Sequence, residues 1–128
     1  MENYYLKLLD KVKPKIIIEV VSYSFNNLLI NEVAKKYKIP TIELQHGTIG
    51  RYHIAYNFKK QIYLPTFPDY IFLFGEYWKN NTRFPISNGK LKVTGFPYFE
   101  HKMNITKESK YHKLREHLRE HLGTVLLC

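Results

Sequence analysis

The apolar positions of the chain switch between helical and strand spacing, and this switching predicts the order of the elements. Pro14 ends a first predicted helix, whose apolar positions recur at helical spacing: Tyr5, Leu8, Leu9 and Val12. Residues 16–21 are apolar except for Glu19, a run typical of a strand buried on both faces of a parallel sheet. Helical spacing returns over residues 28–37, and residues 41–44 predict the next strand.

A second strand, helix and strand follow further along the chain. Residues 69–74 predict a strand, residues 75–80 a short helix, and residues 91–94 a strand that ends before Gly95 and Pro97. Alternating strands and helices are typical of an α/β fold. The pattern therefore predicts a Rossmann-like parallel sheet with helices on both faces.

Right-handed crossovers place the loops that follow parallel strands at one edge of the sheet. We therefore expect residues 22–27 and 45–50 to line one cleft. Residues 51–68 are aromatic and irregular and contain two prolines, and they predict a loop over that cleft.

The C-terminal part of the chain predicts one more helix and the start of a strand. Residues 108–122 form the helix, which Gly123 ends and whose apolar stripe is Tyr111, Leu114, Leu118 and Leu122. Residues 124–127 are apolar and predict a buried strand. A complete domain would bury such a strand by continuing, so we expect the chain to be part of a longer protein.

Composition is that of a globular domain with an excess of positive charge. The 128 residues are 45% hydrophobic, enough for one core, and carry a formal net charge of +9. Residues 1–64 hold ten Lys or Arg against five Asp or Glu, and residues 65–128 hold ten against six, so neither half is a basic tail. No nucleic-acid-binding motif accompanies the charge. We expect no nucleic-acid partner, and the charge fits peripheral contact with an anionic membrane face equally well.

Cys128 is the single cysteine, so the chain forms no internal disulfide, and a reducing compartment is expected. The N-terminal residues lack the apolar stretch of a secretory signal, and no apolar run approaches the length of a membrane span. These features together predict a cytoplasmic protein.

One zinc-like pattern lies on the predicted C-terminal helix. His117 and His121 flank Glu120 as in an inverted zinc-protease motif, but the local sequence is Leu-Arg-Glu-His written twice, as expected for a charged helix with a leucine stripe. A third protein ligand is also lacking. We predict no metal and no cofactor. The nucleophile elbow, the phosphate loop and the Gly-x-Gly-x-x-Gly fingerprint are absent from the sequence as well.

The candidate chemistry lies after the strand at residues 41–44. His46 stands in a Gln-His-Gly turn at the carboxyl edge of the predicted sheet, where open α/β proteins bind ligands. The alternative is that His46 caps a helix or satisfies a buried carbonyl group. Glu19 and Glu43 lie near strand ends and are further candidates for an acid or base.

Three segments together resemble a known family. Gln45-His46-Gly47, the stretch 69–78 and the Val-Thr-Gly-Phe-Pro of residues 93–97 resemble bacterial GT-B glycosyltransferases of surface and capsule polysaccharide synthesis. The same segments are similar to CDP-glycerol glycerophosphotransferases. The resemblance covers roughly residues 14–100.

The resemblance implies a general-base role for His46 toward an acceptor hydroxyl. It implies close backbone approach to the substrate at Gly47, contact of Arg51 and His53 with donor phosphates, and an interdomain turn near Gly95. The substrate-binding residues it implies are Gln45, Gly47, Thr48, Arg51, His53, Gly95 and Pro97.

By the same resemblance, residues 1–100 are an acceptor-side Rossmann-like domain of a two-domain GT-B architecture. Residues 101–128 are a linker helix and the first strand of a donor domain. The implied partners are a nucleotide-sugar donor and a glycan or lipid-linked acceptor. Because the donor site would be missing, the chain alone is expected to turn over little.

Two other interpretations remain open. The first is a flavodoxin-like binding or interaction module without catalysis, in which His46 is structural and residues 51–68 are a partner surface. The second is a sugar-nucleotide epimerase of the same GT-B architecture. The sequence leaves the oligomeric state open.

Overall fold

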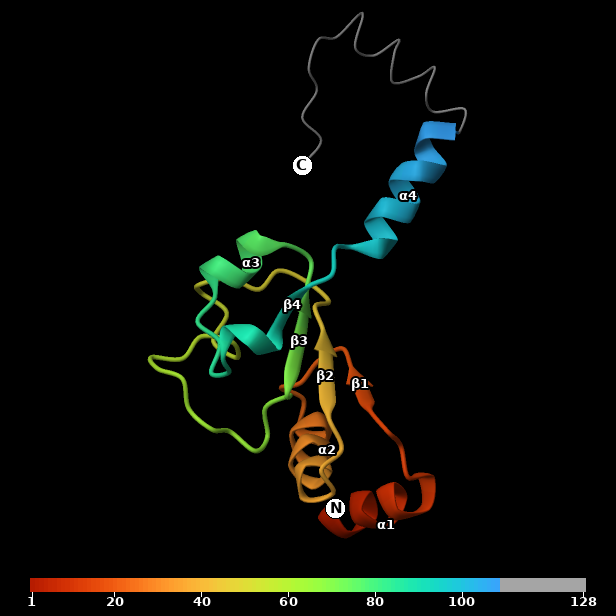
Figure 1. The fold of residues 1–128 in the computed structure, drawn as a ribbon, viewed down its shortest axis with the longest axis vertical. Coiled ribbons are helices and arrows are strands. Elements are labelled where there is room, and N and C mark those ends of the chain that lie inside the picture. Colours follow the sequence, from red (N-terminus) through yellow and green to blue (C-terminus); the bar gives the residue numbers. More distant parts are fainter. Residues whose placement is uncertain (109–128) are drawn as a thin grey trace, which may run out of the picture. The chain divides into compact units, whose positions relative to one another are not determined.

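The computed structural model describes residues 1–108, which fall into two units, Met1–Gly95 and a segment that starts at Phe96. The first unit contains a four-stranded parallel sheet in the order β1-β2-β3-β4 (Figure 1). Its elements are α1 (Glu2–Val12), β1 (Ile17–Glu19), α2 (Phe25–Lys36), β2 (Thr41–Leu44), β3 (Tyr70–Leu73), α3 (Glu76–Asn81), the short 3-10 helix Asn88–Lys90 and β4 (Leu91–Val93). These elements confirm the predicted α/β class and the predicted order of strands and helices.

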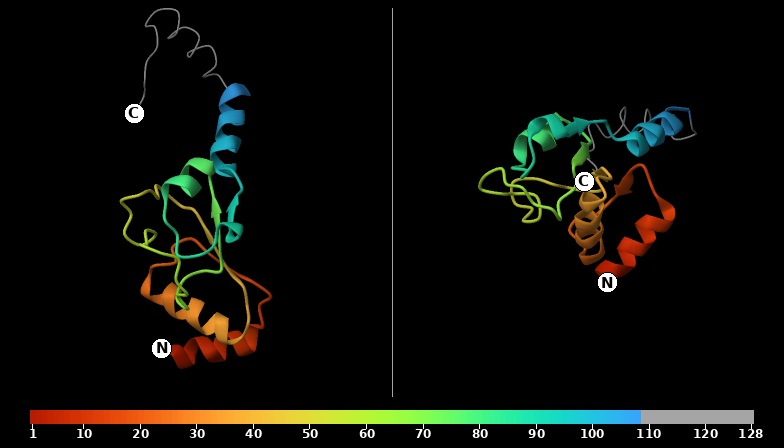
Figure 2. Two further views of the ribbon diagram at one scale, coloured as in Figure 1. Left: turned by 60° about the vertical axis from the view of Figure 1, so that its left-hand side comes forward. Right: turned by 60° about the horizontal axis from the view of Figure 1, so that its bottom comes forward.

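Local signals in the sequence set the ends of the first two helices. Lys13 adopts a left-handed conformation with φ 48° at the end of α1, and Pro14 follows. The side chain of Ser24 caps α2 by accepting a hydrogen bond from the backbone N–H of Asn27 at 3.3 Å. In both views of Figure 2, α1 lies alongside α2.

Both core clusters of the first unit lie on one face of the sheet, and Ile42 is also buried on the opposite face. Register pairs Glu43 with Ile71 and Ile71 with Leu91, so these side chains point to the same side. The larger cluster on this side consists of Ile49, Tyr56, Phe67, Ile71, Leu73, Phe84 and Leu91. A smaller cluster joins α1 and α2 to β1 through Leu9, Val33, Ala34 and the partly buried Ile17.

The opposite face of β1 is exposed, so the prediction that this strand is buried on both faces is wrong. Ile18 on β1 is 60% exposed, and Leu44 on β2 is 38% exposed. The reason is topological. When spatial order follows chain order, right-handed crossovers place every connection on one face. The described part of the first unit therefore lacks the expected helical cover on the Ile18 face.

Residues 51–68 contain no helix or strand, as predicted, but their aromatic side chains contribute directly to the core. Tyr56 and Phe67 are buried members of the larger cluster. Phe58 packs against Phe67 with ring centroids 5.9 Å apart. The loop therefore takes the place of a covering helix between β2 and β3.

The second unit holds a helix that starts before the helix predicted at residues 108–122. α4 spans Pro97–Glu108 and contains Glu100 and His101. Proline is well suited to the first helical position, because its missing N–H is unpaired there in any helix. The predicted helix at 108–122 and strand at 124–127 lie outside the described residues, apart from position 108. Among residues 1–108, no helix is long and apolar enough to cross a membrane.

Two neighbouring substitutions test the one-sided core. Ile17→Asp places a carboxylate against the Leu9, Val33 and Ala34 cluster, so we expect it to lower the free energy of unfolding by about 2 kcal/mol or more. Ile18→Asp on the exposed face is the matched control, and its expected effect is within about 0.5 kcal/mol. Urea denaturation followed by circular dichroism measures both. Equal losses in the two variants would contradict the assignment of faces.

Candidate functional site

The carboxyl ends of β1 and β2 bring two loops together, as the sequence predicted. The register pairs Glu19 with Glu43, so the residues that follow each strand leave the sheet at the same edge. Tyr23 lies in the first loop and His46 in the second, and Tyr23 Oη is 3.4 Å from His46 Nε2. The imidazole of His46 is exposed. The first loop therefore supplies a hydroxyl group directly to the candidate base.

His53 and Tyr56 join Tyr23 and His46 in what we name the Tyr23 cluster. The Tyr23 ring centroid is 5.4 Å from that of His53 and 5.7 Å from that of Tyr56. The rings of His53 and Tyr56 are 4.7 Å apart. Nδ1 of His53 is buried and has no hydrogen-bond partner among the described residues. The cluster has an aromatic floor at Tyr56 and an exposed rim at Tyr23 and His46.

A buried carboxylate lies beneath this cluster. Oε1 of Glu43 accepts hydrogen bonds from the Tyr56 hydroxyl and, at 3.4 Å, from the backbone N–H of Ser22. Burial raises the pKa of Glu43, and the hydrogen bonds from Tyr56 and Ser22 and the charge of His46 oppose that rise. Burial and the adjacent Glu43 also raise the pKa of Tyr56. Tyr56 is therefore a neutral hydrogen-bond donor at physiological pH.

Gln45 holds the turn that carries His46. Its backbone N–H donates to the Phe72 carbonyl at 2.9 Å, and its Oε1 accepts from the backbone N–H of Phe74 at 2.9 Å. Its Nε2 donates to the Gly47 carbonyl at 2.8 Å. Since backbone groups bond both ends of the amide, Gln45 holds the position of His46.

Gly47 and Thr48 follow at the open edge of the sheet. A Cβ atom added to Gly47 would meet no atom within 4 Å, so the space beside this backbone is free. Thr48 is exposed. Both residues are available to a ligand that approaches His46.

The other residues implied by the resemblance are not members of the Tyr23 cluster. Arg51 is exposed and lines a separate cleft together with Asn57 and Arg83. Gly95 has φ 81° and ends the first unit after β4, two strands from β2 in the sheet. Pro97 begins α4 in the second unit. Of the predicted residues, the Tyr23 cluster thus unites His46 with His53.

Sequence reasoning missed Tyr23 and Tyr56. The sequence did contain a signal for Tyr23. Because the parallel strands align Glu19 with Glu43, the residues that follow Ser22 and Gln45 lie side by side. Tyr56 carried no comparable signal. Its position depends on how residues 51–68 fold back on β2, which spacing along the chain does not encode.

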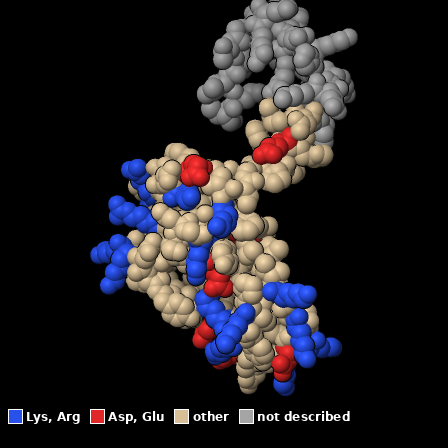
Figure 3. Space-filling model, in the orientation of Figure 1, with Lys and Arg blue, Asp and Glu red and all other residues tan. Residues whose placement is uncertain are grey.

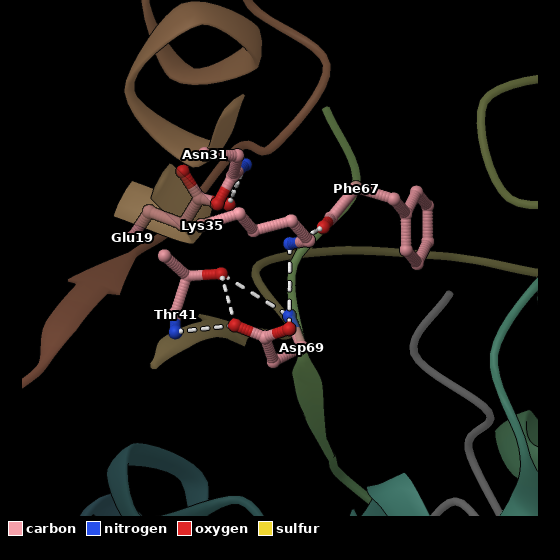
Figure 4. A network of polar contacts seen from close by, with 6 residues as sticks. All are labelled: Glu19, Asn31, Lys35, Thr41, Phe67 and Asp69. Atoms are coloured by element: carbon pink, nitrogen blue, oxygen red, sulfur yellow. Dashed lines mark hydrogen bonds and ion pairs between the residues drawn. The ribbon is translucent and has the colours of Figure 1, made fainter. Parts of the chain in front are cut away.

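A polar network joins α2 to the sheet (Figure 4). Nζ of Lys35 donates to the Phe67 carbonyl at 2.6 Å and lies 3.4 Å from Oδ1 of Asp69. Oδ2 of Asp69 accepts from the backbone N–H and the hydroxyl of Thr41 at 3.0 and 3.3 Å. Asp69, the first residue of the stretch 69–78, therefore fixes the amino ends of β2 and β3.

Glu19 and Asn31 form the other part of this network. Asn31 Nδ2 donates to Glu19 Oε1 at 2.8 Å, while Glu19 Oε2 and Asn31 Oδ1 are buried and lack partners among the described residues. Burial raises the pKa of Glu19 from 4.5 to about 7, with a further rise from the Glu43 charge. When the Glu19 carboxyl group carries a proton, it provides a hydrogen-bond donor next to these buried acceptor oxygens.

Within residues 1–108, no group of three or more His, Cys, Asp or Glu side chains is arranged to hold a metal ion. The zinc-like pair His117 and His121 lies outside the described residues.

Comparisons of the chain with protein-family models, curated proteins and solved structures give no significant match. The geometry of the Tyr23 cluster therefore carries the functional argument.

The raised pKa of Glu19 predicts a pH-dependent stability. In the unfolded chain the carboxyl ionises near its ordinary pKa, whereas in the folded protein it keeps its proton to about pH 7, so stability falls as pH rises between about 4.5 and 7. We expect Glu19→Gln to raise the free energy of unfolding at pH 8, relative to wild type, by about 1–3 kcal/mol. At pH 4 the two proteins should differ little.

Urea denaturation at both pH values measures this effect. Glu76→Gln is the control, because the Glu76 side chain is 64% exposed in the folded protein and therefore loses less contact with water on folding than Glu19 does. The same pH dependence in wild type and in Glu19→Gln would show that Glu19 is not the group responsible.

Proposed function

We propose that this protein is the acceptor-side part of a GT-B glycosyltransferase. It would transfer a sugar or a polyol phosphate from a nucleotide-activated donor to a hydroxyl group of a surface or capsule polysaccharide acceptor. One observation carries the proposal: an exposed imidazole, His46, stands at the carboxyl edge of a parallel sheet with a hydroxyl group 3.4 Å from its Nε2. Ligands of open α/β sheets bind at this edge.

His46 acts as the general base in this proposal. The hydroxyl of Tyr23 reaches Nε2, so an acceptor hydroxyl that displaces it can reach the same atom. The acceptor oxygen attacks the donor, its proton passes to Nε2, and the nucleotide leaves with the electron pair of the broken bond. Burial raises the pKa of the Glu43 carboxyl below, and the charge of His46 opposes this rise.

The remaining members of the cluster position the acceptor. Tyr23 offers an exposed ring at the rim, and aromatic faces bind the apolar faces of sugars. Gly47 leaves open space next to His46. In a GT-B architecture, a second α/β domain would bind the nucleoside of the activated donor, which leaves the donor phosphates free to contact this unit. The net charge of +9 would also suit an enzyme that acts on a lipid-linked acceptor at the cytoplasmic face of a membrane.

A second candidate function is a binding module without catalysis. The observation that favours it is the exposure of three large side chains on the loop 51–68, since Tyr52, Ile54 and Tyr63 are 87%, 90% and 79% exposed. In such a module, Tyr52→Ala would weaken partner binding and His46→Ala would leave it unchanged.

Substitution of His46 tests the proposed function. In a protein where this unit is joined to a donor-binding domain, we expect His46→Ala to lower kcat/KM for transfer by about 10²- to 10⁴-fold. The control is His101→Ala, an exposed histidine on α4, which should retain full activity. Circular dichroism should show that both variants are folded. Full transfer by His46→Ala would remove the central residue from the proposal.

Gly47→Ala separates a ligand effect from a structural one. The added methyl group meets no protein atom within 4 Å, so the melting temperature should stay within about 2 °C of wild type. If the acceptor approaches this backbone, transfer should fall by about 10- to 100-fold. Unchanged transfer would place the acceptor elsewhere.

A further inference from the structure

A polar cleft of about 480 Å³ lies in the first unit, beside the loop 51–68 rather than at the Tyr23 cluster. We name it the basic cleft, after three cationic side chains in its lining: Arg51, Lys59 and Arg83. Three amide side chains, Asn57, Asn80 and Asn81, line it as well. All three cations are exposed and can reach a ligand.

Backbone hydrogen bonds fix the walls of this cleft independently of its cations. The backbone N–H of Arg83 donates to Asn57 Oδ1 at 3.0 Å, and the N–H of Phe58 donates to the Arg83 carbonyl at 2.9 Å. Asn57 Nδ2 donates to the carbonyls of Gly50 and His53 at 2.6 and 2.9 Å. The segment between α3 and β4 and the loop 51–68 are thus held together before any ligand binds.

The described residues supply no counter-charge to the basic cleft. None of the acidic side chains of residues 1–108 lines it. The ion pairs among the described residues involve Lys35, Lys36 and Lys79, and none involves a cation of the cleft. Lys and Arg side chains gather in Figure 3 on the side where the loop 51–68 lies in Figure 1. Like charges in a concave site attract anions and concentrate them there.

We propose that the basic cleft binds a ligand with two linked phosphate groups. Arginine matches phosphate oxygens with paired N–H donors, and lysine adds a point charge. One orthophosphate would leave part of the positive charge unpaired, whereas a pair of linked phosphates can engage all three cations. The volume lies in the range of small-molecule sites, and the amide of Asn80 suits a sugar or polyol hydroxyl next to the phosphates, whereas Asn81 Nδ2 donates to the Tyr77 carbonyl at 2.8 Å.

This assignment deepens the proposed function without depending on His46 chemistry. Linked phosphates occur in the nucleoside diphosphate of an activated donor and in a phosphodiester-linked polyol acceptor. Failure of phosphate binding would leave the assignment of His46 as base intact, and failure of the His46 test would leave the basic cleft intact. The two proposals are therefore tested separately.

Binding of inorganic pyrophosphate to the full chain, measured by isothermal titration calorimetry, tests the cleft. We expect pyrophosphate to bind at least about tenfold more tightly than orthophosphate, and Arg83→Gln and Lys59→Gln each to weaken binding by about tenfold or more. Lys60→Gln is the matched control, because Lys60 is the exposed neighbour of Lys59 and does not line the cleft. It should change the affinity less than about twofold. Equal losses in Lys59→Gln and Lys60→Gln, or no preference for pyrophosphate, would overturn the proposal.

Competition against pyrophosphate then identifies the source of the phosphates. Displacement by CDP or UDP assigns the cleft to the donor, and displacement by a phosphodiester-linked glycerol phosphate dimer assigns it to the acceptor. Either result supports the proposal, provided that Arg83→Gln weakens that ligand too. Binding of pyrophosphate without displacement by any of these compounds would reduce the cleft to a small-anion site and contradict the proposal.

Discussion

The hydrogen bond from the Tyr56 hydroxyl to the buried carboxyl group of Glu43 is the contact on which the candidate site depends. It ties the loop 51–68 to β2, and Ser22 joins the same carboxyl from the loop after β1. The rings of Tyr23 and His53 then pack on Tyr56, and Tyr23 reaches His46. An unpaired buried carboxylate would be costly, so the Tyr56 and Ser22 donors are needed as much for stability as for position.

The same loop shapes two different surfaces. At Tyr56 it supplies the floor of the Tyr23 cluster, and at Asn57 it forms a wall of the basic cleft. Neighbouring side chains of the loop thus contribute to two surfaces. One consists of aromatic and imidazole rings, and the other is cationic. A hydroxyl-bearing acceptor suits the first surface, and linked phosphates suit the second. In the proposed function, the first surface would hold the acceptor and the second a phosphate-bearing group.

Much of the fold was predictable, because periodicity records which face of each element is buried. β2 and β3 lie where their apolar runs predicted them, and Ser24 and Pro14 mark helix ends through local chemistry. The burial of β1 was not predictable. Its apolar run suits a central strand, whereas exposure at Ile18 follows from strand order and the side on which the crossovers run. The start of α4 was missed because Pro97 also suits a turn.

The candidate site was predictable only in part. His46 and His53 were found from a turn motif and a resemblance, and the structure joins them through Tyr23 and Tyr56, whose positions arise from long-range packing. Gln45 shows a further limit. Its place in the motif suggested substrate contact, but its amide bonds the backbone of Gly47 and Phe74. A motif alone does not distinguish a residue that binds from one that positions.

In the proposed function, an acceptor hydroxyl replaces the Tyr23 hydroxyl at Nε2 of His46. Nitrogen-15 NMR of the histidine rings, recorded during addition of glycan or polyol acceptors, tests this exchange. We expect the His46 Nε2 resonance to move on acceptor binding, while the ring of His101 on α4 stays unchanged. Acceptor binding that leaves the His46 ring unaffected would contradict the exchange and the role of His46 as base.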